Sequence, residues 1–499
     1  MRRSFFYKHC TRSWLISNII EIITAVHQFS KNEKLAELTQ HPLLKQIGQI
    51  ADRERAEVYV VGGVVRDALI GRPLGELDFV VVGDGIAFSQ AVAKALNAEP
   101  PTVYRNFGTA MLHHDGRKLE FVGARRESYK SDSRKPDVKP ADLQADLSRR
   151  DFTINTLAMA LNKADYGKLI DPFNGIEDLR NGIIRTPLEP EITFSDDPLR
   201  LMRGIRFATV FNFKIEERTL AGMKASAERL RIISQERITD EFIKILAADK
   251  PSIGFHLMYE TGVLAIIFPE FVELRGAEER KGYMHKDVFN HTLMVVDNAA
   301  SMSKKLPLRF AALVHDIAKP RTKEFTEDKG WSFHGHEDLG ARMLPRIAGR
   351  MKLPIEWLLY AQKLTRLHLR PIALTEEIVT DSAYRRLLFE AGEDFEDLLT
   401  LCRADITSGN AKRRERHLAN FDFVVKRLNE VEEKDKMRAF QSPVRGDEIM
   451  AVCGLTPGPR VGKLKTAIEE AILDGKIPNE HDAALVYLLS IKDEALKTA

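Results

Sequence analysis

The stretch VYVVGGVVRDALIGRPLGELDFVVV, residues 58–82, determines the fold expected for the first third of the chain. It predicts a β-strand, a glycine turn at Gly62 and Gly63, a helix that begins near Val64, a loop and a second strand. Backbone amides at the start of a helix, with no side chains in the way, form a cradle for phosphate. Paired glycines are also common in simple tight turns, so this signal alone is weak.

Carboxylates stand at the entrance to the second strand. Glu76 and Asp78 are i and i+2, so on a strand both side chains leave the same face. Glu120, in KLEFV, is a third acid flanked by apolar residues, as a neighbouring strand would present it. Three carboxylates around two Mg²⁺ ions about 4 Å apart suit in-line nucleotidyl transfer. The alternative, a solvated acidic loop end, fits the preceding glycine turn less well.

Length and composition indicate a protein of several domains without a disulfide framework or a membrane helix. A chain of 499 residues is too long for one core, so about two to four domains are expected. The net charge is only +3, so a polyanionic partner must be met by local basic patches. The three cysteines, Cys10, Cys402 and Cys453, lie far apart, which excludes a disulfide framework and favours a cytoplasmic location. Because no apolar run approaches the ~20 residues of a membrane helix, no membrane partner is expected.

The motif RRDFTINTLAMAL, residues 149–161, contains an Arg-Arg-Asp triplet before what its apolar spacing predicts to be an amphipathic helix. Two interpretations of Asp151 stay open. It either caps that helix or accepts a hydrogen bond from a ribose 2′-hydroxyl, with Arg149 or Arg150 on phosphate.

The motif DDPLRLMRGIRFA, residues 196–208, predicts another helix, with Pro198 at its first position and Asp197 as its N-cap. Capping is a full explanation of Asp197 but not of Arg200, which lies one helical turn further on. Together the two side chains offer an acceptor and a planar donor fork, which can hydrogen-bond the edge of a nucleotide base.

In order, GGVVRD…ELDFVV, RRDFTINTLA, DPFNGIEDLRNGIIR and DDPLRLMRGIRFA resemble the motifs of the bacterial-type (class II) tRNA nucleotidyltransferases, the CCA-adding enzymes, and of the related poly(A) polymerases. The resemblance implies a polymerase-β-like head that uses CTP, ATP and Mg²⁺ without a nucleic acid template. It assigns catalysis to Glu76, Asp78 and Glu120, with Mg²⁺ on the first two. It implies nucleotide binding by Gly62, Gly63, Arg66, Arg149, Arg150, Asp151, Asn155, Asp197, Arg200 and Arg203. The RRD motif would select ribose, and Asp197 with Arg200 would read the Watson–Crick edge of the base.

Two positions depart from the family pattern. Glu76 replaces the usual Asp of an Asp-x-Asp pair, and Asp196 replaces a usual Glu. Both keep the charge, so we expect metal binding to survive. The polar segment RRESYKSDSRKPDVKP, residues 125–140, resembles the flexible loop of the family and favours complete C-C-A addition.

The second half of the chain carries histidines and acids in HKDVFNHTLMVV, LVHDIAKP, FHGHEDLGA, RLHLRP and LCRADITSGN. One histidine on a buried helix is most often a satisfied core residue, but these segments together resemble the HD family of metal-dependent phosphohydrolases. The resemblance implies a divalent transition metal on His291, His315, Asp316 and Asp405, a second metal on His336 and His368, and Lys319 near phosphate. It implies phosphatase or 2′,3′-cyclic phosphodiesterase activity; the alternative is an inherited helical scaffold without turnover.

The predicted fold is an α/β nucleotidyltransferase head followed by a mostly α-helical body that includes an HD-type domain. The expected regions are a leader and helix (1–45), the head (46–186), a helical neck for base recognition and RNA binding (187–280), an HD domain (281–420) and a C-terminal helical tRNA-binding region (421–499). The last region contains Arg460, Lys463 and Lys465, which either contact tRNA phosphates or form a solvated helix face.

We therefore expect an enzyme that adds C, C and A to the 3′ end of tRNA. Three alternatives stay open: a poly(A) polymerase, an enzyme that adds only A or only CC, and an HD phosphohydrolase with a degenerate head. The complete RRD and DDPLR motifs and the intact carboxylates favour the first interpretation over the last. The sequence leaves the oligomeric state open.

Overall fold

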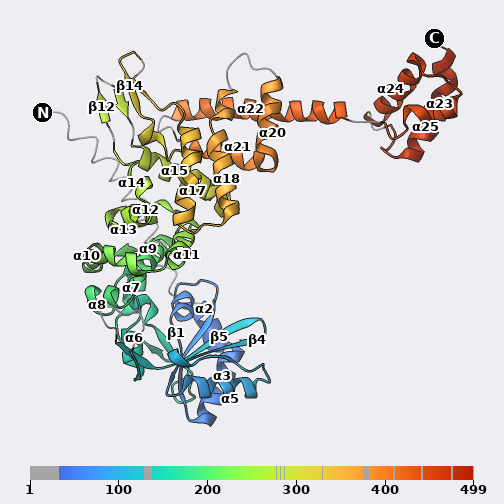
Figure 1. Ribbon diagram of the computed structural model, residues 1–499. Coiled ribbons are helices and arrows are strands. Elements are labelled where there is room, and N and C mark those ends of the chain that lie inside the picture. Colours follow the sequence, from blue (N-terminus) through green and yellow to red (C-terminus); the bar gives the residue numbers. More distant parts are fainter. Residues whose placement is uncertain are drawn as a thin grey trace. The chain divides into compact units, whose positions relative to one another are not determined.

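The structure is a computed structural model that describes residues 33–128, 137–276, 278–280, 283–285, 287–328, 330–374, 381–407, 411–439, 442–473 and 476–497 (Figure 1). Most of the expected leader and residues 129–136 of the expected flexible loop lie outside these ranges. The chain divides into two compact units, Met1–Leu369 with Glu396–Gly409, and Arg370–Phe395 with Asn410–Ala499.

The larger unit begins with an α/β head. Its elements are α2 (Glu33–Gln40), α3 (Pro42–Glu54), β1 (Glu57–Val61), α4 (Gly63–Leu69), β2 (Leu77–Val82), α5 (Gly85–Ala95), β3 (Thr102–Tyr104), η2 (Arg105–Phe107), β4 (Thr109–His114), β5 (Arg117–Gly123), β6 (Arg125–Ser128), β7 (Asp137–Pro140), α6 (Leu143–Ser148), η3 (Thr153–Asn155), β8 (Ala158–Ala160), β9 (Leu169–Ile170), α7 (Gly175–Asn181) and β10 (Ile183–Ile184).

Seven of these strands form one sheet in the order β3-β4-β5-β2-β1-β8-β9. Strands β2 and β5 run parallel, whereas the other neighbouring pairs run antiparallel. The glycine turn between β1 and α4 is where the sequence predicts it. The polar segment expected to be a loop differs from its prediction, because its two ends pair as the antiparallel ribbon β6–β7.

The two faces of the sheet have different roles. Phe79 and Phe121 are direct partners across β2 and β5, and their rings stack 4.7 Å apart. Phe88 of α5 packs edge-on against Phe121 at 5.8 Å, so α5 covers this face (Figure 1). Because strand side chains alternate, Asp78 and Glu120 project from the opposite face. On that face lies a buried cluster that includes α6, formed by Val61, Val80, Ala124, Leu147 and Ala158.

The prediction of a helix after Asp151 was wrong. The segment forms the short turn η3 and then β8, which lies between β1 and the edge strand β9 of the sheet. Ala158 and Met159 are fully buried. A short apolar run that is buried on both faces has no periodicity to distinguish strand from helix, which explains the error.

The rest of the larger unit is mostly helical. Its elements are α8 (Pro190–Asp196), α9 (Arg200–Phe211), β11 (Lys214–Ile215), α10 (Glu217–Ser226), η4 (Ala227–Ile232), α11 (Gln235–Leu246), α12 (Ser252–Glu260), α13 (Val263–Ile267), α14 (Pro269–Val272), β12 (Glu278–Arg280), β13 (Tyr283–His285), α15 (Val288–Met302), α16 (Leu306–Val314), η5 (Lys319–Arg321), β14 (Glu324–Thr326), β15 (Gly330–Ser332), α17 (His336–Arg350), α18 (Ile355–Leu367) and α21 (Phe395–Asp405).

A buried arginine joins three of these helices. Arg309 of α16 is fully buried, and its guanidinium donates to four backbone carbonyls. The acceptors are the oxygens of Leu246 and Ala248 after α11, at 3.0 and 2.8 Å, and those of Ala300 and Ser303 at the end of α15, both at 3.1 Å. Helix ends leave carbonyls without partners, so one side chain satisfies two helix termini at once.

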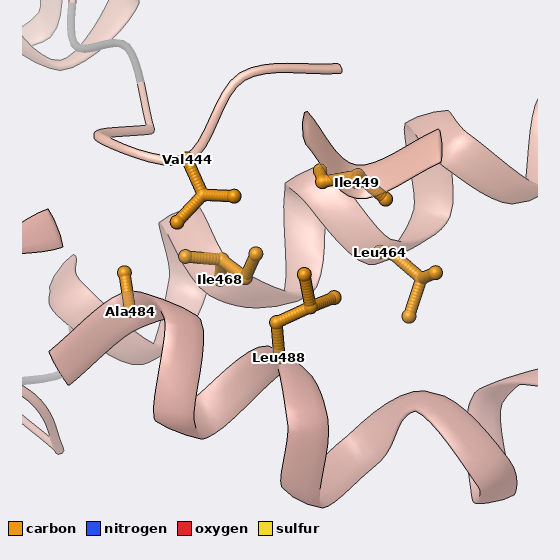
Figure 2. Packing of buried hydrophobic residues seen from close by; sticks show 6 residues of the cluster. All are labelled: Val444, Ile449, Leu464, Ile468, Ala484 and Leu488. Atoms are coloured by element: carbon orange, nitrogen blue, oxygen red, sulfur yellow. The ribbon is translucent and has the colours of Figure 1, made fainter. Parts of the chain in front are cut away.

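The smaller unit contains α19 (Arg370–Ala373), α20 (Asp381–Ala391), η6 (Gly392–Asp394), α22 (Ala411–Ala439), α23 (Gly446–Cys453), α24 (Pro459–Leu473) and α25 (His481–Lys497). Figure 2 shows the core that its last three helices share, in which Ile449, Leu464, Ile468 and Leu488 converge. These apolar side chains recur at helical spacing, so α23, α24 and α25 bury one stripe each.

The predicted architecture, an α/β head followed by a mostly α-helical body, is confirmed. Among the described helices, none combines the length and apolar character needed to cross a membrane. The five region boundaries expected from the sequence stay a prediction.

Candidate active site and candidate metal centre

Three carboxylates predicted from the sequence lie close together at the start of β2 and the middle of β5. Asp78 is the direct partner of Glu120 across the parallel pair. Glu76 is exposed just before β2, with Oε2 3.8 Å from Lys118 Nζ. Burial, followed by the charge of Glu120 and to a smaller extent that of Glu76, raises the pKa of Asp78 to about 6, although Arg150 and Lys118 oppose the shift. Carboxylates that repel one another in this way are stabilised by a bound cation.

The glycine turn lies beside the RRD motif. Gly62 has φ +74°, a left-handed conformation that glycine adopts without strain. A Cβ atom at this position would lie 3.0 Å from Arg150 Nη1. The bare backbone of the turn and a guanidinium group therefore face the same space, next to the carboxylates.

The RRD arginines are held by a residue that sequence reasoning missed. Asp146 of α6 is fully buried, and Oδ1 accepts from Arg149 Nε and Nη2 at 3.0 and 2.7 Å. Its Oδ2 lies 3.3 Å from Arg150 Nη2. Burial alone would raise the pKa of Asp146, but the two arginines outweigh it and hold the pKa below its ordinary value. The signal in the sequence was an acid three and four positions before two arginines.

Asp151 is nearly buried and fully engaged within the protein. Its Oδ1 accepts from Asn155 Nδ2 at 2.9 Å, and its Oδ2 accepts from Arg203 Nε at 2.7 Å. Asn155 Oδ1 in turn accepts from Arg66 Nη1 at 2.6 Å. Burial acts to raise the pKa of Asp151, but Arg203, Asn155 and Arg200 together hold it well below the usual range. Four predicted nucleotide-binding residues thus form one connected network.

The DDPLR motif differs slightly from its predicted form. Helix α9 begins at Arg200, so Asp197 caps the turn before the helix, with Oδ1 accepting from Leu199 N at 3.1 Å. Arg237 Nη2, which the sequence did not single out, lies 3.1 Å from Asp197 Oδ2. Arg200 is buried and donates to the carbonyls of Thr193 and Arg149, at 3.2 and 2.6 Å, which connects α9 to the RRD motif.

All six residues expected to form the HD centre come together, although they are drawn from five helices. His291 lies in α15, His315 and Asp316 follow α16, His336 begins α17, His368 follows α18, and Asp405 ends α21. Their ligand atoms form two groups, His291 with His315 and Asp405, and Asp316 with His336 and His368, each within 4.8 Å. Asp316 also contacts the first group, with Oδ2 3.2 Å from His315 Nε2.

The histidine rings are oriented for metal binding. Nδ1 of His315, His336 and His368 lies 2.7–2.8 Å from the carbonyls of Ala312, Phe333 and Thr365, respectively. A carbonyl only accepts, so each Nδ1 carries a proton, and each Nε2 faces the centre, where it can offer its lone pair to a metal. His315 Nε2 and Asp316 Oδ1 are buried without a hydrogen-bond partner. These donor atoms fit a divalent transition metal.

Electrostatics also favour a cation in this centre. Burial by itself would lower the pKa of His315, yet Asp316 and Asp405 raise it to about 10. Burial, assisted by the charge of His315, lowers the pKa of His368 to about 4. Lys319 Nζ, predicted to lie near phosphate, is 2.6 Å from Asp316 Oδ2. The buried acids therefore attract one positive charge, either a proton on His315 or a metal in its place.

Comparison with known families matches three segments. Residues 58–185 match the family described as "Poly A polymerase head domain", residues 212–274 match "Probable RNA and SrmB- binding site of polymerase A", and residues 288–410 match "HD domain". The first two follow the order of the head and the helices after it, and the third contains the whole histidine and aspartate cluster.

Curated relatives cover much of the chain. The multifunctional CCA protein of Nitrosococcus oceani is 35% identical over 361 residues, which span 70% of this chain and 84% of that protein. The A-adding tRNA nucleotidyltransferase of Halalkalibacterium halodurans is 41% identical over 241 residues, 46% of this chain and 56% of that protein. That of Deinococcus radiodurans is 31% identical over 353 residues, 69% of this chain and 78% of that protein.

Solved structures resemble the fold. A tRNA nucleotidyltransferase in complex with a primer tRNA and an incoming ATP analogue is 25% identical, with a TM-score of 0.56 over 77% of this chain and 99% of that one. The Thermotoga maritima CCA-adding enzyme in complex with tRNA is 22% identical, with a TM-score of 0.56 over 94% of this chain and 98% of that one. The second likeness is one of fold alone.

Proposed function

This chain belongs to the tRNA nucleotidyltransferase family with a poly A polymerase head domain, and from that premise we propose that it adds C, C and A to the 3′ end of tRNA. The substrates would be CTP and ATP, selected without a nucleic acid template. The observation that carries the proposal is the direct pairing of Asp78 with Glu120 on the sheet face beside Arg150. This pairing brings two carboxylates next to a guanidinium group and a bare glycine turn, which supports the proposed metal site.

We propose that each part of the site acts on one part of the nucleotide. Mg²⁺ held by Glu76, Asp78 and Glu120 would activate the primer hydroxyl and neutralise the triphosphate. Arg149 and Arg150, oriented by Asp146, would bind phosphate oxygens through their planar donor forks.

The ribose and the base would be bound further along the site. Asp151 is occupied by Arg203 and Asn155, so we propose that it acts on the ribose by orienting these two side chains. Asp197 and Arg200, on the turn and first residue of α9, would hydrogen-bond the edge of the base. Both already have protein partners, which would have to be exchanged in part for those of cytosine or adenine.

A second candidate is addition of A alone. It is favoured by the identity of 41% to an A-adding relative, which exceeds that to the multifunctional CCA protein. The segment that bears on this choice includes residues 129–136, outside the described ranges. Poly(A) addition is the third member of this group. We give preference to complete CCA addition because the polar segment 125–140 is present in the chain.

The experiment supplies labelled CTP and ATP with Mg²⁺ to three tRNA transcripts, which end before CCA, after CC and after CCA. Stepwise addition that stops at CCA supports the proposal. Incorporation only of A on the second transcript, or a long A tail, moves the protein to the corresponding sister activity. The Asp78→Ala variant, assayed in parallel, tests whether any incorporation depends on the proposed carboxylates.

We propose a metal-dependent phosphohydrolase activity for the HD centre, toward phosphate monoesters or 2′,3′-cyclic phosphates. The support is the convergence of six side chains able to bind metal, among which His315 Nε2 and Asp316 Oδ1 are buried without a hydrogen-bond partner. A bound divalent metal would supply a nucleophilic water at neutral pH. Hydrolysis of 2′,3′-cyclic AMP by wild type, compared with His336→Ala, tests the proposal; equal rates in the two proteins would reject it. The Mg²⁺ in the head and a cytoplasmic location stay predictions.

A further inference from the structure

Phe207, in the middle of α9, lies where the head meets the helices that follow it. Its ring is 4% exposed. It stacks on Phe211 with centroids 5.8 Å apart and planes 2° from parallel, and it contacts Phe152 edge-on at 6.0 Å. Phe152 directly follows Asp151 in the RRD motif. One apolar ring therefore touches a motif of the head while it belongs to the helix proposed to read the base.

Guanidinium groups from both sides surround this pair of rings. The centres of Arg206, Arg66 and Arg203 lie 4.1, 5.2 and 5.4 Å from the Phe207 centroid. Arg66 is also 4.8 Å from the centroid of Phe211, and Arg72 is 4.7 Å from it. All five distances are within the ~6 Å range of cation–π attraction. Arg66 and Arg72 belong to the head, whereas Arg203 and Arg206 belong to α9.

Acidic partners offset the accumulated positive charge. Arg66 Nη2 is 2.8 Å from Asp67, Arg203 Nη2 is 2.6 Å from Asp151, and Arg206 Nε is 2.5 Å from Glu241. Glu241 is 3% exposed and Asp151 is 6% exposed, so both acids lie where water is largely excluded, whereas the Arg203 side chain is 36% exposed. Cation–π attraction is stronger where water is excluded.

The contacts close into a ring of residues. Arg66 donates to Asn155, Asn155 donates to Asp151, and Asp151 accepts from Arg203. Phe207 completes the circuit, because both Arg66 and Arg203 lie over its face. A planar guanidinium that is packed on a ring loses freedom to tilt, so Phe207 restrains the same two arginines that the polar network holds from the other side.

We infer that Phe207 is a positioning residue that holds the glycine turn and α4 of the head at a fixed separation from α9. This inference rests on the proposed function, in which the head binds the triphosphate and α9 reads the base of the same nucleotide. The separation between these two elements then sets how well CTP or ATP spans the pocket. Loosening the Phe207 contact weakens nucleotide binding and base discrimination more than it slows transfer from a nucleotide that is already bound.

The test compares Phe207→Leu with Phe242→Leu. Phe242 of α11 is a fully buried ring that packs edge-on against Phe255 at 5.6 Å, so its substitution removes the same atoms from a core position. For Phe207→Leu we expect the KM for CTP and ATP to rise about tenfold, the scale of one or two desolvated cation–π contacts, with kcat within about threefold. We also expect more incorporation of UTP and GTP. Phe242→Leu should leave both KM values unchanged. Phe207→Tyr, which keeps the aromatic ring, should have KM values close to those of wild type.

A second readout does not need activity. Hydrogen exchange of the amides in residues 58–66 and 149–157 should be faster in Phe207→Leu than in wild type, and unchanged in Phe242→Leu. If wild type incorporates no nucleotide, the proposed function fails, and exchange still decides the inference. Equal KM values and equal protection in the two leucine variants would overturn it. If Phe207→Leu does not fold, Phe211→Leu tests the same stack at a half-buried ring and should shift both readouts in the same direction.

Discussion

The Nε2 atoms of His336 and His368 lie 3.4 Å apart, and each ring is held in place by a hydrogen bond from its Nδ1 to a backbone carbonyl. Two lone pairs that point at each other are unfavourable unless a proton or a metal ion lies between them. The rings are 5% and 1% exposed, so water does not relieve the repulsion freely.

Metal should therefore stabilise the larger unit. At a concentration of about 100 times Kd, a metal that binds only the folded state adds about 2.7 kcal/mol to the free energy of unfolding. We expect Mn²⁺ or Ni²⁺ to raise the thermal midpoint, and EDTA to reverse the increase. His336→Gln should abolish the shift, whereas His334→Gln, an exposed histidine two residues earlier, should retain it. An equal shift in both variants would place the metal elsewhere.

Substitution of Asp78 by a neutral residue should increase stability and decrease activity. Its folded-state pKa is raised to about 6, so the cost to the folded state is absent below the unfolded value of about 3.9, grows as pH rises to about 6, and is complete above that pH. In Mg²⁺-free buffer at pH 8, Asp78→Asn should be more stable than wild type by up to about 2–3 kcal/mol, and the difference should narrow as pH falls below about 6 and vanish near pH 3. Incorporation should fall at least about a thousandfold. Thermal melts at both pH values, together with the primer extension assay, test the two effects separately.

Activity should tolerate the replacement of Glu76 by Asp, the residue that is usual in the family at this position. Glu76→Asp keeps the charge and shortens the side chain by one methylene, so we expect activity within about threefold of wild type. Glu76→Gln removes the charge and should lower incorporation by at least about a hundredfold. Steady-state rates over a Mg²⁺ titration are the measurement. Full activity of Glu76→Gln would show that Asp78 and Glu120 suffice to hold the metal.

The buried Asp146 should make stability depend on acid pH. Its folded-state pKa is depressed, so its stabilisation is complete above the unfolded value of about 3.9 and is lost as pH falls through the folded value. Asp146→Asn should cost about 2 kcal/mol at pH 7, the scale of a charge-assisted hydrogen bond. The difference from wild type should stay constant down to about pH 5 and narrow below about pH 4. If the difference in free energy of unfolding between wild type and Asp146→Asn did not change with pH, the charge of Asp146 would not be what stabilises its contacts with the arginines.

Arg309 should contribute strongly to the stability of the packing between the helices it joins. Arg309→Met leaves four carbonyls at two helix ends without a donor, so we expect a loss of about 3 kcal/mol and a fall in the thermal midpoint. Arg218→Met is the matched control, because its side chain is 73% exposed and pairs with Glu189 at the surface. Surface pairs contribute about 0–1 kcal/mol, so the control should melt near wild type. Similar midpoints for both variants would contradict this role of Arg309.

Sequence reasoning predicted the site best where chemistry imposes a local spacing. Glu76, Asp78 and the glycine turn lie within one continuous stretch, and alternation along β2 was enough to predict the face from which Asp78 projects. The six HD residues that the family resemblance implied do come together in the structure, and their role as metal ligands stays a prediction. Asp146 was missed because its role depends on how α6 packs against the sheet. The segment after Asp151 was assigned to a helix because an apolar run of that length fits either structure.

The parallel pairing of β2 with β5 has a consequence for folding. Strands β4 and β5 form a hairpin through Asp115 and Gly116, both with positive φ, a turn that closes locally and fast. The pairing of Asp78 with Glu120 must instead wait until about forty residues between them have been brought into place, which costs loop entropy. In a chain still emerging from the ribosome, β1 and β2 are therefore available to pair before β5 has been synthesised, and the candidate site forms only afterwards. The acids that repel one another are brought together only once most of the sheet exists to hold them.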